Sequence, residues 1–502
     1  MSKISVSSAI LGVIEYAEAK GLLSAADKTW ATNSVLGFLR LISLEPSALP
    51  AALPLEELLD ILLDDAVERG VIINTAANRD LLDTALMGAV TPRPSEISES
   101  FWTCYSDTPK AATDWFYRFC RDCNYIREYR LKRDLKWSYL SQYGEMEITI
   151  NLAKPEKDPL DIAAALHTQK SDYPACQLCR ENEGYFGRAD YPARQNLRIV
   201  PVKILGEDWG FQYSPYVYYN EHSIVLNDIH TPMVIDEACF RKLFDFIEMF
   251  PHYFVGSNAD LPIVGGSILS HEHFQAGRYV FPIERAEIIE ELSASRQDNV
   301  SISRLNWPMP TLRLRGENSE TLVKTAGIIL ETWRGYDDLD ADIISNTDGT
   351  PHNTVTPIAR KRGQLYELDL VLRNNRTTAE HPLGLFHPHA ELHHIKKENI
   401  GLIEVMGLAI LPPHLKTELQ LIGEAMLSGG DLHGAEISRH ADWAEEILSR
   451  KKPTKQNIDE VLREEVGAVF VKCLEHAAVF GQDKKGTAAF RRFTEKLMEK
   501  LK

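Results

Sequence analysis

A unit of antiparallel strands and a helix occurs twice in this chain, and it constrains the fold more than any single motif. The similarity lies in the order of apolar periodicities, about 3.6 residues in the helices and 2 in the strands, and not in residue identity. Two such units predict an α+β protein built from two halves. The strand-like runs are 146–152, 197–204, 216–219, 223–226 and 253–255 in the first unit and 311–314, 352–359, 366–373 and 400–411 in the second, and the helices are 158–169, a stretch around Phe244 and 321–333.

Both ends of the chain are predicted to be helical. The first amphipathic helix is expected to begin at Ser7 or Ser8 and to end at Gly21, because serine favours the start and glycine the end of a helix. The last segment is basic, with Phe490 and Phe493 on one face, which predicts a docked helix with a solvated side. The expected regions are a helical extension at 1–140, a first half at 141–300, a second half at 301–413 and a C-terminal helical region at 414–502.

The stretch 264–277 contains the strongest candidate for chemistry. His271, His273 and Gln275 occupy alternate positions, and small residues lie on both sides. In a strand these three side chains point to one face and the residues between them to the other. Glycine allows a bulky ligand to approach the backbone closely. The set suits phosphate chemistry, while the alternative is a half-exposed strand with polar side chains, because short motifs often occur by chance.

His273 is the candidate nucleophile. A neutral imidazole is available near pH 7, since its unperturbed pKa is about 6.5. One ring nitrogen can attack phosphorus if an acceptor, often a backbone carbonyl, holds the proton of the other. Gln275 can donate to a phosphate oxygen but cannot act as an acid, which favours transfer to a second substrate over hydrolysis.

Cys176-x-x-Cys179 has the spacing of a metal knuckle. Zinc favours four ligands, and His230 and His271 are the best partners because each adjoins a predicted strand. Cys120-x-x-Cys123 lies in a predicted helix, where buried packing thiols are the better interpretation. The alternative for the first pair is two unliganded loop thiols.

Composition limits the function classes. The net charge is −17, which argues against binding nucleic acid or anionic membranes but not against a small anionic substrate. Apolar runs stay shorter than the roughly 20 residues of a membrane helix, and the N-terminus is too weakly apolar for a signal peptide. Seven cysteines without an export signal indicate reduced thiols and a cytoplasmic protein. A second copy could cover the sheet edges, which allows a homodimer.

These motifs resemble those of a known family. His271-Glu-His273-Phe-Gln275, preceded by Asn258 and Gly265-Gly-Ser267, resembles the H-P-H-G-Q active site of galactose-1-phosphate uridylyltransferases, which belong to the histidine-triad superfamily. Residues 173–179 are similar to the metal knuckle of that family and 226–232 to the segment with its third metal ligand. Residues 85–95, 125–127 and 372–376 resemble the bacterial class II branch.

The resemblance implies a fold of two histidine-triad-like halves and a two-step reaction in galactose metabolism. His273 would take UMP from UDP-glucose, releasing glucose 1-phosphate, and pass it to galactose 1-phosphate to form UDP-galactose, with ping-pong kinetics. Gln275 would bind the phosphate, and a structural zinc would be held by Cys176, Cys179, His230 and His271. The implied substrate-binding residues are Asn258, Ser267, Phe211, Tyr213, Arg373 and Arg376.

The sequence departs from the family pattern at several places. Glu272 and Phe274 replace a proline and a glycine, although both should face away from the substrate. The strand at 366–372 lacks the histidines of a second metal site that another branch of the family has. His387-Pro-His389 lacks the following glutamine, so we expect a loop with a supporting role. Two further hypotheses are another histidine-triad nucleotidyltransferase or dinucleoside polyphosphate phosphorylase, and a zinc-stabilised scaffold without activity.

Overall fold

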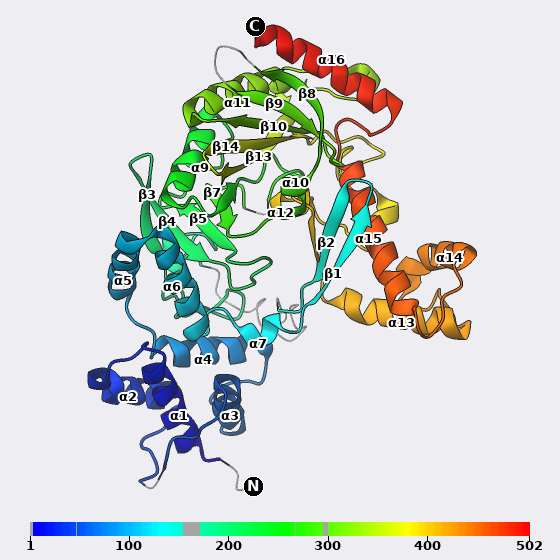
Figure 1. Cartoon of the computed structure of the whole chain (residues 1–502). Coiled ribbons are helices and arrows are strands. Elements are labelled where there is room, and N and C mark those ends of the chain that lie inside the picture. The colour runs from blue at the N-terminus through cyan, green and yellow to red at the C-terminus, as the bar shows by residue number, and fades with distance from the viewer. Residues whose placement is uncertain (1–3, 47, 154–170, 267, 295–299, 502) are drawn as a thin grey trace.

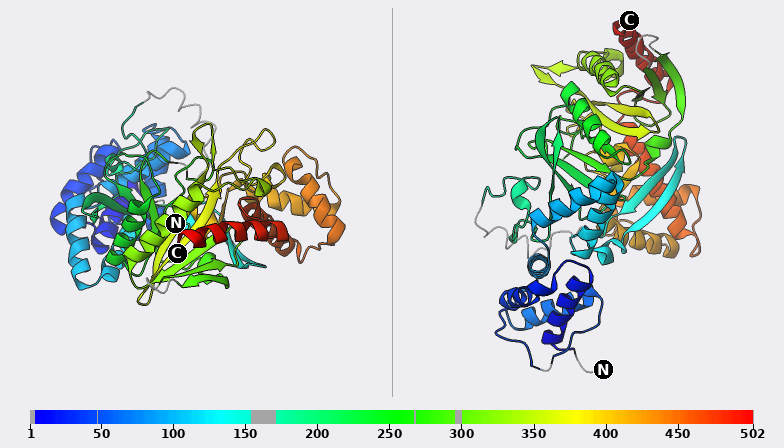
Figure 2. Two further views of the ribbon diagram at one scale, coloured as in Figure 1. Left: turned by 90° about the horizontal axis from the view of Figure 1, so that it is seen from above. Right: turned by 60° about the vertical axis from the view of Figure 1, so that its left-hand side comes forward.

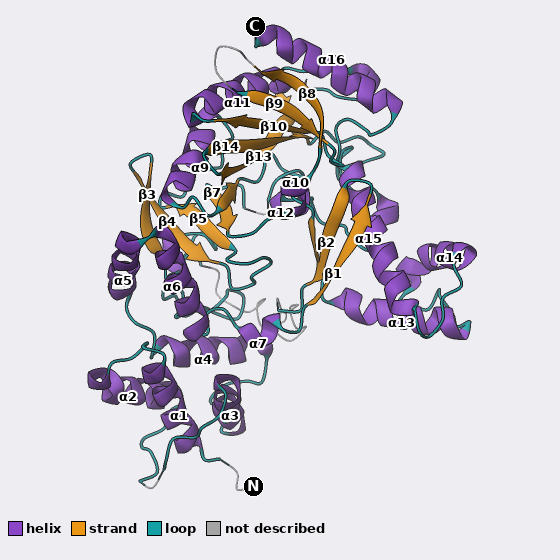
Figure 3. Cartoon of the chain, viewed as in Figure 1, coloured by secondary structure: helices purple, strands orange, loops and turns teal. Residues whose placement is uncertain are grey.

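The computed structural model describes residues 4–46, 48–153, 171–266, 268–294 and 300–501. The chain begins and ends in groups of helices, and all of the strands in its described part lie between residues 135 and 411, as Figures 1 and 3 show. The helices are α1 Val6–Ala19, α2 Lys28–Phe38, α3 Leu55–Glu68, α4 Ala76–Gly88, α5 Pro94–Asp107, α6 Pro109–Asp122, α7 Glu128–Leu131, α9 Glu237–Met249, α10 Pro282–Arg285, α11 Ser319–Arg334, α12 Leu402–Val405, α13 His414–Ser428, α14 Ala441–Arg450, α15 Ile458–His476 and α16 Lys484–Lys500. The strands are β1 Leu135–Ser141, β2 Gly144–Ile150, β3 Val200–Ile204, β4 Glu207–Tyr213, β5 Ser223–Asn227, β6 Phe254–Gly256, β7 His273–Gly277, β8 Ile288–Ala294, β9 Ser301–Leu305, β10 Thr311–Gly316, β11 Asn346–Thr347, β12 Thr350–Pro351, β13 Asn353–Arg362, β14 Leu365–Asn374 and β15 Leu408–Leu411.

A ten-stranded sheet with a mirrored strand order forms the centre of the molecule. The order is β3-β4-β5-β7-β6-β13-β14-β10-β9-β8. Counted from the two edges inward, β3, β4, β5, β7 and β6 of the first half correspond to β8, β9, β10, β14 and β13 of the second. The halves meet where β6 pairs antiparallel with β13. In each half a helix precedes the strand at the join, α9 before β6 and α11 before β13. The predicted repeat and the α+β class are confirmed, and the two halves share one continuous sheet.

The two faces of this sheet belong to different hydrophobic cores. Residues directly opposite each other on neighbouring strands point to the same face. Phe274, Val225 and Phe211 are opposite one another and face the core that includes α9 and α11; we call this the helix face. The other face, the site face, carries His273 and Gln275. Ile358 on that face packs into a second core, with α12, α15 and the smaller sheet.

A three-stranded sheet, β1-β2-β15, covers part of the site face and joins distant segments. β2 runs parallel to β15, with Ile148 opposite Ala409. Helix α15 packs on β1, where a Cβ at Gly467 would lie 2.4 Å from the Tyr139 ring, so only glycine allows this approach. The N-terminal helices lie at one end of the molecule and α16 at the other (Figure 2).

The C-terminal basic segment is a docked helix, as predicted. Phe490 and Phe493 of α16 are buried, and the Phe493 ring centroid lies 5.4 Å from that of Trp333 in α11. Arg492 is ion-paired with Asp338 on the solvated side. No helix in the described part of the chain is both long and apolar enough to cross a membrane.

Several expected boundaries are wrong. Helix α1 is capped by Ser5, before either predicted serine. Residues 216–219 form a turn with a positive φ at Val217, and not a strand. The expected strand at 400–411 is divided into α12 and β15, because the chain turns at Gly407, where φ is 96° and a Cβ would lie 2.8 Å from the Trp307 ring.

The strand that carries the candidate site is shorter than expected. β7 begins only at His273, and the described residues before it, 264–266 and 268–272, belong to no named strand. The expected region boundaries after residues 140 and 300 fall within the β1–β2 and β8–β9 hairpins. The helix expected at 158–169 lies outside the described residues.

Candidate active site and metal centre

His273 is the first residue of β7, between β5 and β6. Its side chain is buried, and Nδ1 lies 2.8 Å from the carbonyl oxygen of His271. That carbonyl accepts the Nδ1 proton, so the lone pair of the neutral ring lies on Nε2. Burial lowers the pKa of His273 to about 4, so the ring is neutral at pH 7. The imidazole therefore meets the protonation requirements of a nucleophile.

Gln275 has a partner that sequence analysis missed. Its Oε1 lies 3.2 Å from Nε2 of His222, which precedes β5. Burial lowers the pKa of His222 to about 3, so this neutral ring donates its Nε2 proton to the carboxamide oxygen. The amide nitrogen of Gln275 is thereby free to donate elsewhere. The Tyr218 ring stacks on His222 with centroids 5.3 Å apart, and the Tyr219 ring lies tilted against it at 4.5 Å, so the imidazole is held in place.

The four predicted metal ligands come together. The ligand atoms of Cys176, Cys179, His230 and His271 all lie within 4.8 Å of one another. Cys176 Sγ lies 3.2 Å from His271 Nδ1, and Cys179 Sγ lies 3.1 Å from His230 Nδ1. The two sulfur atoms are 3.5 Å apart. Tetrahedral zinc with ordinary bond lengths separates sulfur from nitrogen by about 3.5 Å and two sulfurs by about 3.8 Å, so the donor set and its spacing fit zinc.

Hydrogen bonds outside the ligand set orient it. His271 Nε2 donates to the carbonyl oxygen of Asn227 at 2.7 Å, which directs Nδ1 toward the thiols. Asn182 Nδ2 donates to the carbonyl oxygens of Cys176 and Cys179 at 2.8 and 2.7 Å and shapes the knuckle. Because His271 anchors the metal group and its carbonyl holds His273, one residue joins the two sites.

Glu272, between the two histidines, points away from the site face as predicted. Its buried carboxylate accepts from Lys242 of α9 at 2.8 Å and from Asn227 Nδ2 at 2.9 Å. Its backbone N–H donates to the carbonyl oxygen of Thr231 at 2.7 Å. The neighbouring Phe274 ring stacks on Trp209 with centroids 5.1 Å apart. These contacts fix the segment that presents His273.

Asn258 lies behind the glycine-rich loop. Its Oδ1 accepts from the backbone N–H of Leu402 at 2.9 Å. A Cβ at Gly266 would lie 2.8 Å from Asn258 Nδ2, so the loop approaches this amide as only glycine permits. Ser267, the other residue expected here, lies outside the described residues.

The two expected arginines have different surroundings. Arg373 is buried and shares the site face with Gln275, through paired residues on β6, β13 and β14. It donates to the carbonyl oxygen of Ile400 at 2.8 Å, while its Nε has no hydrogen-bond partner among the described residues. Burial lowers the pKa of Arg373 to about 10. Arg376, beyond the end of β14, donates to the carbonyl oxygen of Asp342 at 2.8 Å and braces a loop.

Phe211 and Tyr213 do not face the site, which corrects the expected role in substrate binding. Both are fully buried on the helix face, among the aromatic rings of α6. Tyr213 Oη donates to the carbonyl oxygen of Thr113 at 3.0 Å. On β4 the residues that share a face with His273 and Gln275 are Gly210 and Gln212, so the expectation was displaced by one residue.

Comparison with known proteins gives the family. Models of the N-terminal and C-terminal domains of galactose-1-phosphate uridyl transferase match residues 54–232 and 246–445. A galactose-1-phosphate uridylyltransferase of Halalkalibacterium halodurans is 49% identical over 99% of this chain and 100% of its own length. The enzymes of Clostridium acetobutylicum and Bacillus subtilis are 48% and 47% identical over 94% and 97% of this chain, and each is covered over 96% of its own length. This chain belongs to the galactose-1-phosphate uridylyltransferase family.

A solved structure of a yeast Ap4A phosphorylase also matches, with 12% identity, a TM-score of 0.29 and coverage of 62% of this chain and 86% of that one. A similarity this remote does not bear on function. Membership of the galactose-1-phosphate uridylyltransferase family therefore rests on the full-length relatives.

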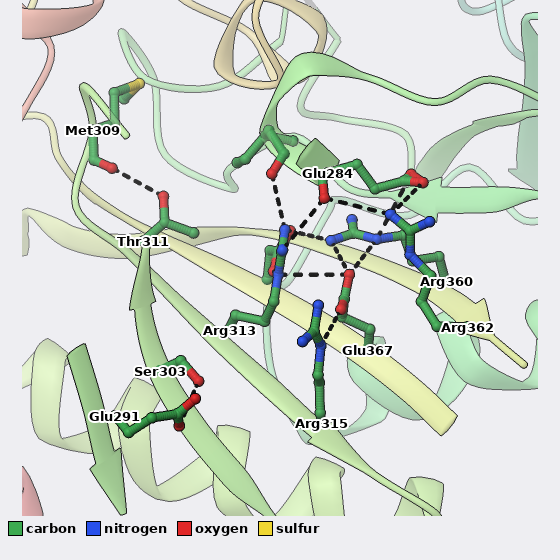
Figure 4. Close-up of polar contacts among 12 residues, drawn as sticks. Glu284, Glu291, Ser303, Met309, Thr311, Arg313, Arg315, Arg360, Arg362 and Glu367 are labelled. Carbon is green, nitrogen blue, oxygen red and sulfur yellow. Dashed lines mark hydrogen bonds and ion pairs between the residues drawn. The ribbon is translucent and has the colours of Figure 1, made fainter. Parts of the chain in front are cut away.

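In this member of the galactose-1-phosphate uridylyltransferase family, the second half of the site face carries a buried ion network. Arg313 Nε lies 2.7 Å from Asp369 Oδ1, and Arg360 Nε lies 2.6 Å from Glu367 Oε1. Figure 4 shows the arginines converging on Glu367, with Glu284 beside Arg360. β14 corresponds to β7 in the mirrored order. The second half therefore has the ion-paired Glu367 and Asp369 on the strand that corresponds to the one carrying His273.

The basic run at 127–136 borders a cavity of about 480 Å³. Arg127 and Arg130 line it, but both are ion-paired with Asp80 at 2.7 and 2.6 Å. Gln177 of the metal knuckle also lines the cavity. Arg127 and Arg130 are therefore partly buried and neutralised, whereas Lys132, Arg133 and Lys136 of the same run are exposed.

Proposed function

We propose that the chain transfers UMP from UDP-glucose to galactose 1-phosphate through a covalent intermediate on His273. The observation that supports this most directly is the bond from His273 Nδ1 to the carbonyl oxygen of His271. It leaves the lone pair of a neutral ring on Nε2, on the face that also carries Gln275 and Arg373.

In the first step, Nε2 of His273 attacks the α-phosphorus of UDP-glucose. A phosphorus–nitrogen bond forms, and the bond from the α-phosphorus to the bridging oxygen breaks, releasing glucose 1-phosphate. The ring acquires a positive charge, which the carbonyl of His271 stabilises through Nδ1. The amide nitrogen of Gln275, turned outward by His222, donates to a phosphate oxygen.

In the second step, a phosphate oxygen of galactose 1-phosphate attacks the same phosphorus. The phosphorus–nitrogen bond breaks, UDP-galactose forms and His273 returns to its neutral state. Gln275 cannot accept or release a proton in either step, so it does not activate water. The intermediate therefore persists until the sugar phosphate arrives.

Zinc is the metal we propose for Cys176, Cys179, His230 and His271. Four protein ligands make a closed site, which is typical of structural zinc and would contribute folding energy beside the nucleophile. Asn258, Arg373 and Arg376 remain proposed substrate-binding residues. The seven cysteines all lie among the described residues and form no disulfide there, which supports a cytoplasmic protein. The homodimer remains a prediction that light scattering can test.

The test is mass spectrometry of the intact chain after incubation with UDP-glucose. We expect a uridylyl adduct on the peptide that contains His273, released by galactose 1-phosphate. ATP serves as the competing donor, and His273→Gly as the variant without a nucleophile. An adduct formed from ATP alone, or equal exchange of glucose 1-phosphate into UDP-glucose by His273→Gly and the parent, would exclude the proposal.

A further inference from the structure

A second group of metal-ligand side chains lies between the loop after β14 and the end of α15. Ligand atoms of His389, Glu391 and His476 all lie within 4.8 Å of one another. His389 and His476 are 87 residues apart in sequence, and His476 is the last residue of α15. The group contains none of the thiols, carboxylates or imidazoles assigned to the active site and its metal centre.

The hydrogen bonds of His389 leave a ligand atom available. Its Nε2 lies 3.1 Å from the carbonyl oxygen of Leu385, which accepts the proton and leaves the lone pair on Nδ1. A backbone carbonyl of this kind commonly fixes the tautomer of a metal-binding histidine. His271 of the metal centre is held in the same way, through the carbonyl of Asn227.

The spacing of the other two groups also suits a metal ion. His476 Nδ1 lies 4.0 Å from Glu391 Oε1, while nitrogen and oxygen ligands of one tetrahedral zinc are about 3.4 Å apart. Glu391 is exposed, so a small rotation of its side chain closes the difference. The backbone N–H of His389 approaches the same nitrogen at 3.4 Å, a long contact that a metal bond can replace.

Three imidazole rings are in contact at this position, with the His381 and His389 rings stacked and the His476 ring tilted against that of His389. The ring of His389 lies between those of His381 and His476, with centroids 4.1 and 4.5 Å apart. Burial, together with the nearby His389, lowers the pKa of His476. Neutral imidazole is the form that binds a metal. The neighbouring Glu475 is already used, because it accepts from Tyr143 Oη at 2.8 Å.

We propose that His389, Glu391 and His476 bind a divalent transition-metal ion, with solvent completing the coordination. Two imidazoles and one carboxylate form a set that zinc and related metals bind with an open position. The ion would tie the loop after β14 to the C-terminal helical region. The proposal is independent of the uridylyl transfer.

Cobalt(II) distinguishes this site from the one with thiols. We expect the chelator-stripped parent to bind two equivalents of Co²⁺, of which only one produces a thiolate-to-cobalt charge-transfer band. Glu391→Gln and His476→Gln should each lower the affinity for the Co²⁺ that gives no charge-transfer band by about tenfold or more. The charge-transfer band of the other Co²⁺ should stay unchanged. His433→Gln is the matched control, because His433 forms an exposed pair with Glu445 at 3.0 Å.

Circular dichroism checks that each variant is folded. Cys176→Ser should still bind the Co²⁺ that gives no charge-transfer band and should lose the Co²⁺ that gives it. If Cys176→Ser does not fold, Glu391→Gln tests the same separation, because it should lose the first ion and keep the second. The proposal is overturned if the parent binds only the equivalent with the charge-transfer band. It is also overturned if the double variant Glu391→Gln/His476→Gln binds as much Co²⁺ as the parent. That result would mean that the histidines at this position only contact one another and bind no metal.

Discussion

Nε2 of His222 donates a proton to Oε1 of Gln275 across 3.2 Å, from a ring that is buried and neutral. A carboxamide can rotate by half a turn and exchange its oxygen for its nitrogen at little steric cost. While the His222 proton is on Nε2, this hydrogen bond holds the carboxamide oxygen toward the ring and turns the amide nitrogen away from it. The orientation of the Gln275 amide is thus linked to a residue that is not among the proposed substrate-binding residues.

Replacing His222 with phenylalanine should slow formation of the uridylyl adduct by about ten- to a hundredfold, since the amide group loses its fixed orientation. The rate of adduct formation, measured by rapid quench, checks this. His252→Phe is the matched control, because His252 is also partly buried with its pKa lowered to about 4 but hydrogen-bonds to Thr113 instead. Equal losses in the two variants would assign the effect to packing alone.

Replacing Gln275 with histidine should turn part of the transfer into hydrolysis. An imidazole can help a water molecule attack the intermediate, whereas the amide cannot. We expect glucose 1-phosphate to be released from UDP-glucose without galactose 1-phosphate, faster than in the parent. Phosphorus NMR of the products measures the rate of hydrolysis and the rate of transfer. An unchanged ratio of hydrolysis to transfer would show that Gln275 does not exclude water chemistry.

Cys176→Ser should lower zinc content and thermal stability together, because the four ligands join three separate segments. The loss of unfolding free energy is expected to be on the order of a few kcal/mol. Cys120→Ser should leave the zinc content unchanged, since that thiol is buried in α6. Elemental analysis and calorimetry provide the two readouts, and the reverse pattern would identify the other pair as the knuckle.

Lys242→Met should destabilise the protein by about 3–5 kcal/mol, because it leaves the buried carboxylate of Glu272 without its cation. Lys242→Met/Glu272→Gln should recover much of this loss, since no unpaired charge remains. Urea unfolding of both variants checks the prediction. A double variant as unstable as Lys242→Met would show that an unpaired Glu272 charge is not the cause of the loss.

Stability should decrease as the pH falls from about 6.5 toward 4. Burial lowers the pKa values of His222 and His394 to about 3, from an unfolded value of 6.5. Between about pH 3 and 6.5 the unfolded chain binds more protons than the folded one. The free energy of unfolding therefore decreases as the pH is lowered. Urea midpoints at pH 8, 6.5 and 5 measure the slope. His222→Phe should reduce it, and an unchanged slope would exclude His222 as a contributor.

The sequence predicted those features that depend on local spacing. The closeness of Cys176 and Cys179, the alternation of His273 and Gln275 and the direction of Glu272 away from the site face follow from positions within a few residues, and the structure shows each of them. Phe211 and Tyr213 were misplaced because the face of a strand depends on cross-strand register, where a shift of one residue exchanges the faces. His222 was missed for the same reason, since its contact requires β5 beside β7.

The turn at Gly407 shows a further limit of sequence analysis. An apolar run at 400–411 is compatible with one strand, and only the packing of Trp307 and Pro282 against Gly407 explains the break. Tertiary contacts of this kind are not encoded in apolar periodicity. The same holds for the join between β6 and β13, which depends on two segments about a hundred residues apart.

The mirrored strand order has a consequence for how this enzyme tolerates change. Both halves have the same strand order, yet the first presents the proposed nucleophile His273 on β7 and the second a buried set of opposite charges on β14. A substitution at His273 removes the proposed nucleophile but leaves the fold intact. A substitution at Glu367 or Asp369 leaves buried guanidinium groups uncompensated and weakens the scaffold itself. The first half thus carries the proposed chemistry, and the paired charges of the second half stabilise the shared sheet.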